Sequence, residues 1–244
     1  MSQVALVTGS SRGLGFTLAD FLAAQGYDLV LTARDQEVLE DSAAKLRETA
    51  RGQVIALAGD VSNPSHRDVL IEKAEELGGL DLLVNNASDL GPSPLPLLQD
   101  YPLERLEHLY RVNVFAPLAL VQKALPFLRA RAGLVVNLSS DAAVGGYEGW
   151  GGYGSSKAAL DLLTLTLANE GVNAVSVDPG DMRTNMHQAA FPGEDISDRP
   201  LPEVTLPFWA WLLGQNPQEV SGGRFQAQGE RWETRQKTEQ EVSA

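Results

Sequence analysis

The sequence contains no cysteine, which excludes disulfide bonds and thiol chemistry and predicts a cytoplasmic protein. It also has no run of about 18 apolar residues, so no membrane-spanning helix is expected. Strand-like sequence begins at Gln3, which leaves no room for a signal peptide. Only three histidines are present, and the spacing of His66, His108 and His187 is not that of a metal site. Surface or helix-capping roles are the simpler interpretation, and no metal is predicted.

Positive charge is also scarce, because the formal net charge of the 244 residues is −13. Such an acidic surface argues against binding to nucleic acids or to anionic membranes. An anionic ligand would therefore need cationic contacts that are local to its site. Apolar residues make up 43% of the chain, which is enough for a sizeable core.

Short apolar runs rich in β-branched residues alternate with amphipathic helical patterns. Strands that are apolar on both faces and separated by helices are typical of a parallel sheet covered by helices on both sides. No internal repeat, low-complexity block or linker interrupts the alternation, so a single α/β domain over residues 1–228 is predicted. Strands are expected at 4–8, 28–33, 54–58, 81–86, 133–139, 172–178 and 222–228, and the longest helical patterns cover 103–128 and 153–169.

Two segments depart from this alternation. Residues 88–102 contain Gly91 and four prolines, and residues 181–205 are polar and rich in proline. Long loops in compact domains are usually functional or disordered, so both are predicted to shape a substrate pocket. The polar residues 229–244 are expected to form a tail that is frayed or that contacts another subunit. An apolar-leaning pocket is suggested by Leu95, Leu97, Tyr101, Met182, Met186 and Phe191.

The first predicted strand leads into the glycine-rich turn "TGSSRGLG" at residues 8–15, and a helix follows. Gly9, Gly13 and Gly15 allow a tight turn and a close approach of the backbone to a pyrophosphate. The N–H groups and dipole of the helix that begins near Leu14 favour the anion. A plain strand-to-helix turn does not need three glycines within seven residues. This turn, in a β-α-β unit, favours a Rossmann-type doubly wound sheet that binds a dinucleotide.

The end of the second predicted strand bears on the choice between NAD and NADP. Enzymes that prefer NAD tend to place an acidic residue there for the ribose hydroxyl. Here Ala33 and Arg34 occupy the region, and Arg34 with Arg12 could clamp a 2′-phosphate. NADP is therefore the predicted cofactor, with NAD possible. The alternative is that Arg34 only pairs with Asp35 or Glu37 at the start of a solvated helix.

Together with further motifs, this turn resembles the short-chain dehydrogenase/reductase family. The resemblance covers about residues 3–185 and continues more loosely to residue 228. Each motif is modest by itself, but the set is specific because it occurs in the family's order and spacing. The motifs are "TGSSRGLG" (8–15), "GDV" (59–61), "NNA" (85–87), Asn113, "VVNLSS" (135–140), "YGSSK" (153–157) and "DPGDMRT" (178–184).

The resemblance implies an NAD(P)-dependent oxidoreductase that transfers a hydride between nicotinamide and a carbonyl or alcohol carbon. It places Asp60 at the adenine amine with Val61 beside the ring, and Pro179 at the nicotinamide end. The implied cofactor-binding set is Gly9, Ser11, Arg12, Gly13, Leu14, Gly15, Arg34, Asp60, Val61, Asn86, Ala87, Tyr153, Lys157, Pro179, Gly180 and Thr184.

The same resemblance implies four catalytic residues, of which Asn113 would hold a water in a proton relay. Ser140 lies at the family's distance of thirteen residues before Tyr153, so it rather than Ser139 is the implied catalytic serine. Tyr153 and Lys157 are four apart and share a helix face, so the cation is expected to lower the pKa of the phenol. Taken singly, the serine, asparagine and lysine could each be an ordinary structural residue, and only their joint pattern favours catalysis.

Two features depart from the family pattern. Ser88 follows "NNA" where the family usually has a glycine, and the tail lacks the usual glycine-rich ending. The hydroxymethyl group of Ser88 is expected to be tolerated. A non-catalytic dinucleotide sensor on the same fold is the alternative function, although it could dispense with Tyr153, Lys157 or Ser140. A sugar-nucleotide epimerase would need a larger C-terminal domain. Family relatives also imply a homodimer or homotetramer built on the helices at 103–130 and 153–169.

Overall fold

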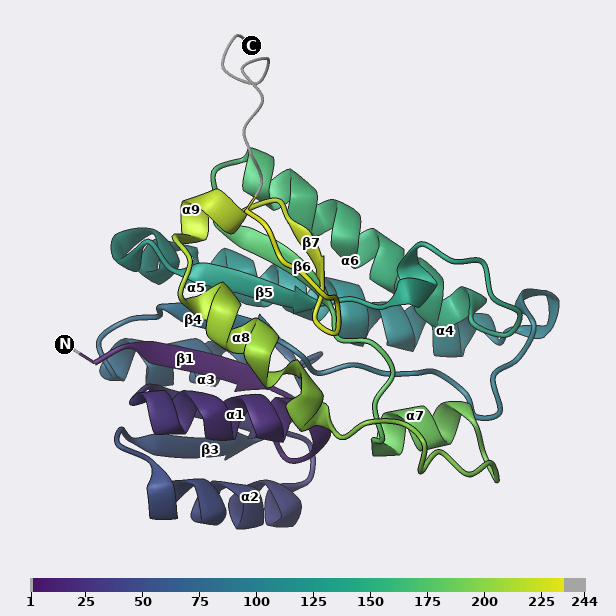
Figure 1. Ribbon diagram of the computed structural model, residues 1–244, viewed down its shortest axis with the longest axis horizontal. Helices are drawn as coiled ribbons and strands as arrows, with labels where there is room; N and C mark the ends of the chain where they lie inside the picture. The colour runs from purple at the N-terminus through teal and green to yellow at the C-terminus, as the bar shows by residue number, and fades with distance from the viewer. Residues whose placement is uncertain (1, 235–244) are drawn as a thin grey trace, which may run out of the picture.

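The protein, described here from a computed structural model, is built around a seven-stranded sheet (Figure 1). The structure describes residues 2–234, so most of the predicted tail, residues 235–244, lies outside the described part. All strand pairs are parallel, in the order β3-β2-β1-β4-β5-β6-β7, which confirms the predicted doubly wound α/β fold. The strands are β1 (Val4–Thr8), β2 (Asp28–Ala33), β3 (Val54–Ala58), β4 (Leu82–Asn85), β5 (Leu134–Leu138), β6 (Ala174–Asp178) and β7 (Arg224–Gln226).

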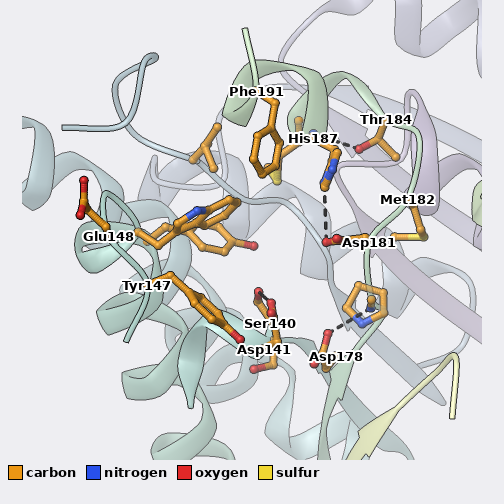
Figure 2. A pocket seen from close by; sticks show the side chains of 17 residues that line it. Ser140, Asp141, Tyr147, Glu148, Asp178, Asp181, Met182, Thr184, His187 and Phe191 are labelled. Carbon is orange, nitrogen blue, oxygen red and sulfur yellow. Dashed lines mark hydrogen bonds and ion pairs between the residues drawn. The ribbon is translucent and has the colours of Figure 1, made fainter. Parts of the chain in front are cut away.

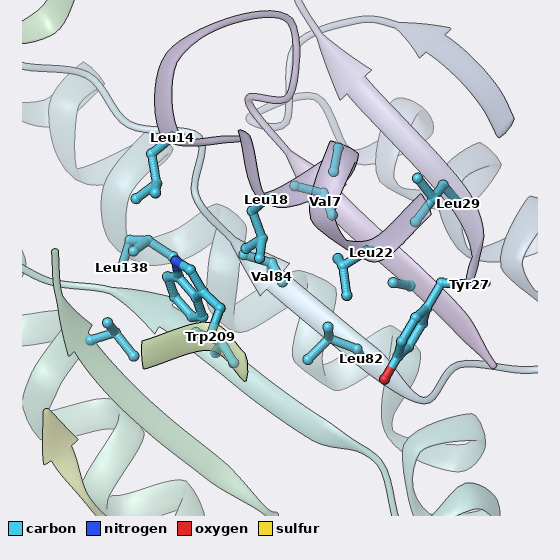
Figure 3. Close-up of a cluster of buried hydrophobic side chains, with 14 of the residues drawn as sticks. Val7, Leu14, Leu18, Leu22, Tyr27, Leu29, Leu82, Val84, Leu138 and Trp209 are labelled. Carbon is cyan, nitrogen blue, oxygen red and sulfur yellow. The ribbon is translucent and has the colours of Figure 1, made fainter. Parts of the chain in front are cut away.

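Helices cover both faces of the sheet because alternate residues of the strands point to opposite sides. In β1, Ala5 and Val7 belong to one buried cluster, and Val4 and Leu6 belong to the other. The first cluster also receives Leu18 from α1 and Trp209 from α8 (Figure 3). One layer contains α1 (Gly13–Gln25), α2 (Gln36–Thr49) and α8 (Leu206–Leu213), and the other contains α3 (Pro64–Glu76), α4 (Leu103–Tyr110), α5 (Ala116–Arg131) and α6 (Gly151–Asn169).

Local sequence explains where several helices begin and end. The Asp35 side chain accepts a hydrogen bond of 3.2 Å from the N–H of Val38 and caps α2. Asn63 caps α3, whose first residue is Pro64. Gly26 ends α1 in the left-handed conformation, at a φ of 93°. These signals set the ends of the helices. The carboxyl ends of the strands lie along one edge of the sheet because all strand pairs are parallel.

Strand order reverses between β1 and β4, which lie side by side although two β-α units separate them in sequence. The connections from these two strands depart to opposite faces, so a crevice opens beyond their carboxyl ends. Thr8 ends β1, and Asn85 ends β4, so the glycine-rich turn and the "NNA" motif meet at this crevice.

The long helical pattern predicted over 103–128 is interrupted in the structure. A π-helical turn (Arg111–Phe115) separates α4 from α5. Pro117 has no N–H to donate to the carbonyl of Asn113 four residues earlier, which explains why regular α-helical bonding fails at this point. The turn carries Asn113 into the protein interior, where its side chain is fully buried.

The C-terminal third contains helices that the sequence interpretation did not include. Residues 181–205, predicted as a loop, contain α7 (Asn185–Ala190), whose N-terminus is capped by Thr184. The apolar segment of α8 follows, and then α9 (Pro217–Val220). Trp232 lies in the segment predicted to be frayed or to contact another subunit, but it packs on Phe208 at a ring distance of 5.4 Å.

Within residues 2–234, no helix is both long and apolar enough to cross a bilayer.

Candidate active site

Two adjoining cavities lie at the carboxyl ends of the strands. The larger has a volume of about 740 Å³ and extends from the glycine-rich turn to Lys157. The smaller has a volume of about 370 Å³ and lies beside Ser140 and α7 (Figure 2). Tyr153 lines both cavities and therefore stands at their junction.

Most of the predicted cofactor-binding residues line the larger cavity. Gly15 and Gly180 do not line it, although Gly180 lines the smaller one. The residues of the predicted set that it brings together are Gly9, Ser11, Arg12, Gly13, Leu14, Arg34, Asp60, Val61, Asn86, Ala87, Tyr153, Lys157, Pro179 and Thr184.

The glycines of the turn are required by its geometry. Gly9 has a φ of 67°, and a Cβ atom there would lie 2.9 Å from the Cα of Ala87. A Cβ on Gly15 would collide with the carbonyl oxygen of Gly9, so this glycine allows α1 to approach the turn. The first turn of α1 has no acidic residue, and no side chain from residues 2–234 caps its N–H groups. Such a helix N-terminus suits a phosphate.

A network between β1 and β4 holds this turn in place. The hydroxyl oxygen of Thr8 accepts hydrogen bonds from the backbone N–H groups of Asn86, at 3.0 Å, and Ala87, at 2.9 Å. The Asn86 amide nitrogen donates to the carbonyl oxygens of Thr8 and Gly9, at 2.9 and 3.0 Å. Thr8 was not among the predicted site residues, although it is the first letter of the glycine-rich motif.

Arg12 and Arg34 are both exposed and both line the larger cavity. Within residues 2–234, the ion pairs include none between Arg34 and Asp35 or Glu37, so the alternative role considered for Arg34 is not observed. Arg34 instead acts on Asp60. Burial raises the pKa of Asp60, but hydrogen bonds from Ser62 and the charge of Arg34 outweigh it and lower the pKa overall. The two guanidinium groups remain available to an anion.

Tyr153 and Lys157 are brought together, as their spacing on α6 predicts. The Lys157 ammonium nitrogen lies 5.4 Å from the centroid of the Tyr153 ring. It donates a 2.8 Å hydrogen bond to the carbonyl oxygen of Leu138 at the end of β5. Lys157 is only 2% exposed, and this burial lowers its pKa to about 8, against an opposing effect of Asp161.

The pKa of Tyr153 is raised, whereas the sequence predicted that it would be lowered. Burial of the phenol raises its pKa, and the nearby carboxylates of Asp178 and Asp141 raise it further. A hydrogen bond with the Ser88 side chain lowers it, but by less. The expectation that Lys157 lowers the pKa of this phenol below its usual value is therefore wrong for the described structure, because desolvation dominates.

Ser140 lies at the wall of the smaller cavity, where its hydroxyl is already hydrogen-bonded (Figure 2). Its Oγ donates to the Asp141 carboxylate at 2.9 Å and accepts from the N–H of Ala142 at 3.1 Å. The adjacent Ser139 lines both cavities, and its Oγ is buried with no hydrogen-bond partner among the described residues. A substrate oxygen would have to compete with Asp141 for the Ser140 proton.

Asn113 lines neither cavity, and its side chain is fully engaged by protein groups. Its Oδ1 accepts from the N–H of Asp89 at 2.7 Å and from the Ser88 hydroxyl at 3.2 Å. Its Nδ2 donates to the carbonyl oxygen of Asp89 at 2.8 Å and to the Ser156 hydroxyl at 3.0 Å. The side chain thus connects the segment after β4 to α6, and the water-holding role of Asn113 remains a prediction.

The segment after β6 closes the junction of the two cavities. Pro179 and Thr184 line both. Gly180 adopts a φ of 74°, and Gln228 fixes the segment by donating from its amide to the carbonyl oxygens of Pro179 and Asp181, at 3.0 and 2.9 Å. Gln228 comes from beyond β7, a position that gave no signal in the sequence.

The smaller cavity is lined mainly by aromatic rings and carboxylates. Trp150 stands edge-on to Tyr153 at a ring distance of 5.8 Å, and Phe191 packs on Trp150 at 6.1 Å. Among the described residues that line this cavity, none is a lysine or an arginine. Its ring-bearing side chains are Tyr147, Trp150, Tyr153, His187 and Phe191, and its acidic ones are Asp141, Glu148, Asp178 and Asp181.

Comparison with known proteins identifies the family. The family model described as short chain dehydrogenase matches residues 3–195. The chain belongs to the short chain dehydrogenase family. An uncharacterized oxidoreductase of Saccharomyces cerevisiae is 38% identical over 191 residues, which cover 76% of this chain and 73% of that protein.

Solved structures agree with this assignment to the short chain dehydrogenases. The oxidoreductase YciK of Escherichia coli superposes with a TM-score of 0.85 at 30% identity, over 93% of this chain and 95% of that one. An alcohol dehydrogenase from Thermococcus sibiricus, solved with 5-hydroxy-NADP, gives a TM-score of 0.82 at 28% identity, over 93% and 96% of the two chains. The protein is thus an NAD(P)-dependent short-chain dehydrogenase/reductase.

The structure of this short chain dehydrogenase adds site residues that sequence reasoning missed. Asp141 and Asp178 act on Tyr153 through their charges, and Trp150 contacts its ring. The only signal for Ser88 was its departure from the family glycine. Within residues 2–234, no group of three or more His, Cys, Asp or Glu side chains could hold a metal ion.

Proposed function

We propose that this dehydrogenase transfers a hydride between NADP(H) and a carbonyl or alcohol substrate, with Tyr153 as the general acid and base. The observation that carries the proposal is the position of Tyr153 at the junction of the two cavities, with Lys157 on the side of the larger and Ser140 on the side of the smaller. A dinucleotide in the larger cavity would supply the hydride. A substrate in the smaller cavity would place its oxygen beside the phenol.

The proton chemistry follows from the surroundings of Tyr153. In carbonyl reduction, the phenol gives its proton to the substrate oxygen, and its raised pKa keeps that proton in place at neutral pH. In alcohol oxidation, the phenol must first lose its proton, and the charge of Lys157 favours the ionised form. Ser140 would donate to the substrate oxygen after releasing Asp141.

Two observations support NADP over NAD. Arg12 and Arg34 are exposed at the larger cavity without ion pairs among the described residues, and no acidic residue stands at the end of β2 before Arg34. Guanidinium groups in this arrangement suit the 2′-phosphate. The solved relative with 5-hydroxy-NADP binds a cofactor of this class.

The lining of the smaller cavity bears on the substrate. Its aromatic rings offer apolar contact area, and its carboxylates would repel an anion. We therefore propose a neutral or cationic carbonyl compound rather than a keto acid or a phosphorylated ketone. We also propose a homodimer or homotetramer, supported by the exposed apolar side chains of Leu103, Phe115 and Leu162 on the segments 103–130 and 153–169. The absence of cysteine is consistent with the proposed cytoplasmic location.

One experiment separates this function from a dinucleotide sensor that does not turn over. Purified protein would be titrated with NADPH and then assayed for NADPH consumption against a panel of neutral, cationic and anionic ketones. Consumption with at least one ketone supports the enzyme. Tight NADPH binding without consumption across the panel would favour the sensor.

A further inference from the structure

Arg224 on β7 connects three segments that carry residues of the candidate site. Its Nε donates a 2.9 Å hydrogen bond to the Oδ2 of Asp161, and its Nη2 donates a 2.7 Å hydrogen bond to the carbonyl oxygen of Ser140. The same Nη2 lies 3.7 Å from the Oδ2 of Asp178. These acceptors belong to α6, to the segment after β5 and to the end of β6, so one guanidinium group links all three.

The peptide group of Ser140 that Arg224 holds is also the start of a short turn. Its carbonyl oxygen accepts from the N–H of Ala143 at 3.1 Å, and the Ser140 Oγ accepts from the N–H of Ala142 at 3.1 Å. These bonds belong to a 3-10 turn that follows β5, and they hold the Ser140 hydroxyl oxygen in place. The planar fork of the Arg224 guanidinium fixes the direction of the hydrogen bond to this turn.

Asp161 joins this link to the helix that carries the phenol. It lies on α6 about two turns after Tyr153. The Oδ1 of Asp161 is buried with no hydrogen-bond partner among residues 2–234, which leaves its Oδ2 to make the contact with Arg224. The segment of Ser140 is therefore tied to α6 through Arg224.

A second contact between this turn and α6 lies at Gly154. A Cβ atom there would lie 2.4 Å from the carbonyl oxygen of Ala142, so the glycine lets the turn pack directly on the helix. Together with the link through Arg224, this contact holds the segment of Ser140 against α6 at two points. Both contacts therefore bear on the separation of the Ser140 hydroxyl and the Tyr153 phenol, the two groups that would address the same substrate oxygen.

The charge of Arg224 also acts on a carboxylate of the site. Asp178 is 4% exposed and lines the smaller cavity (Figure 2). Burial raises the pKa of Asp178 overall, whereas a hydrogen bond from the N–H of Gly180 and the charge of Arg224 lower it. Arg224 thus offsets part of the cost of burying this carboxylate.

We propose that Arg224 is a positioning residue, which ties the carbonyl group of Ser140 to α6 and so holds the Ser140 hydroxyl and the Tyr153 phenol at the spacing that one substrate oxygen needs. This inference rests on the function proposed above. Arg224 is not among the described residues that line either cavity. It would therefore act through Ser140 rather than by touching the substrate or the dinucleotide.

The test is a double-mutant cycle between Arg224→Met and Ser140→Ala in ketone reduction. Arg224→Met is expected to lower kcat about 10- to 100-fold, the cost of a small misplacement of a reacting group, and to leave the Kd for NADPH within about twofold. In the Ser140→Ala background the same substitution is expected to change kcat by less than about threefold, because the hydroxyl to be positioned is gone. An effect of equal size in both backgrounds would overturn the inference, since it would show that Arg224 acts by another route.

Two further variants separate the fork from the charge and from the loss of any arginine. Arg224→Lys keeps the positive charge but not the planar fork, and its kcat is expected to fall with that of the methionine variant. A lysine variant with the wild-type kcat would overturn the inference. Arg47→Met is the matched control, because Arg47 also pairs with a carboxylate, that of Glu40, and donates to a backbone carbonyl, that of Val54, at 3.0 Å. Arg47 lines neither cavity, and its replacement is expected to keep the wild-type kcat.

A second readout does not depend on turnover. The N–H groups of Ala142 and Ala143 donate to Ser140, and their hydrogen exchange can be followed by NMR. Exchange of both is expected to be about tenfold faster in Arg224→Met than in Arg47→Met. Unchanged exchange would overturn the inference. Absence of turnover in the wild type would instead contradict the proposed function, and the exchange rates would still test the link between Arg224 and the turn.

Discussion

The Lys157 ammonium nitrogen lies 5.4 Å from the centroid of the Tyr153 ring while its hydrogen bond goes to the carbonyl oxygen of Leu138. The cation is thus anchored to the end of β5 and lies over the face of the Tyr153 ring. Because this anchor does not involve the phenol, the lysine and the tyrosine can be replaced one at a time.

Replacement of the reactive phenol gives the most direct prediction. Tyr153→Phe is expected to lower kcat by about 10² to 10⁴, the usual contribution of a general acid or base. NADPH affinity is expected to stay within about twofold. Stopped-flow assays and fluorescence titration measure these two quantities. Turnover near the wild-type rate would show that another group moves the proton.

Burial of Lys157 predicts a specific dependence of stability on pH. Its folded pKa of about 8 lies below its unfolded value of 10.5, so between these values the unfolded state binds more protons. The free energy of unfolding therefore gains from this residue as the pH rises through that window. Below pH 8 the full penalty of the buried charge applies, about 3 kcal/mol by linkage.

Lys157→Met removes this charge with little change in side-chain length. Relative to the wild type, the variant is expected to be more stable at pH 7 and to lose that advantage by about pH 10.5, as measured by urea unfolding at several pH values. Its turnover is expected to be lost. An equal difference in unfolding free energy at all these pH values would contradict the assigned burial penalty.

The negative charge of Asp141 predicts a change in the pH dependence of kcat/KM for alcohol oxidation, whose acidic limb reports ionisation of the Tyr153 phenol. Asp141 raises the pKa of Tyr153, so Asp141→Asn is expected to move the acidic limb of alcohol oxidation to lower pH. Asparagine keeps an oxygen for the hydrogen bonds from Ser140 and from the N–H of Ala142. A limb that moves upward, or a variant with the same profile as the wild type, would count against this electrostatic effect.

The two arginines predict the cofactor preference. Arg34→Ala is expected to weaken NADPH binding by about 10- to 100-fold, the loss of one charged hydrogen-bonded contact, and to leave NADH binding nearly unchanged. Arg51→Ala, an exposed arginine before β3, is the matched control. Equal affinities of the wild type for NADPH and NADH would refute the proposed preference.

The acidic and aromatic lining of the smaller cavity predicts how substrate charge affects the rate. Among ketones of similar shape, one that carries a carboxylate is expected to have the lowest kcat/KM and one that carries an ammonium group the highest. Added salt should reduce this difference in kcat/KM. Glu148 is an exposed residue of the cavity lining, and Glu148→Gln is expected to reduce the same difference in kcat/KM. A preference for the carboxylate form would overturn the proposed substrate class.

Much of the architecture could be predicted because it depends on patterns within short stretches of the sequence. Strands that are apolar on both faces predicted the parallel sheet. The glycine-rich turn from Gly9 to Gly15 and the Tyr153–Lys157 spacing predicted the residues at the centre of the site. The π-helical turn at Asn113 was missed, although Pro117 was its cause. The apolar residues before and after Pro117 continue the same helical periodicity, so the periodicity by itself predicts one uninterrupted helix.

The remaining site depends on contacts between distant segments, which no local pattern encodes. Gln228 fixes Pro179 across forty-nine positions of sequence. The direction of the Tyr153 pKa was mispredicted because helix spacing shows a neighbouring cation but not the depth of burial or the carboxylate of Asp178. Ser88 was noticed only as a departure from the usual motif, and its hydrogen bond to Asn113, twenty-five residues away, could not be predicted from the sequence.

The arrangement of the four tryptophans gives the protein two separate optical reporters. Trp209, Trp211 and Trp232 surround Phe208 at ring distances of 5.0, 5.9 and 5.4 Å, where their emission follows the integrity of the C-terminal packing. Of the four tryptophans, only Trp150 lines the smaller cavity. The difference between the emission of the wild type and that of Trp150→Phe therefore isolates the signal of the substrate site, so ligand entry can be followed without any turnover or label.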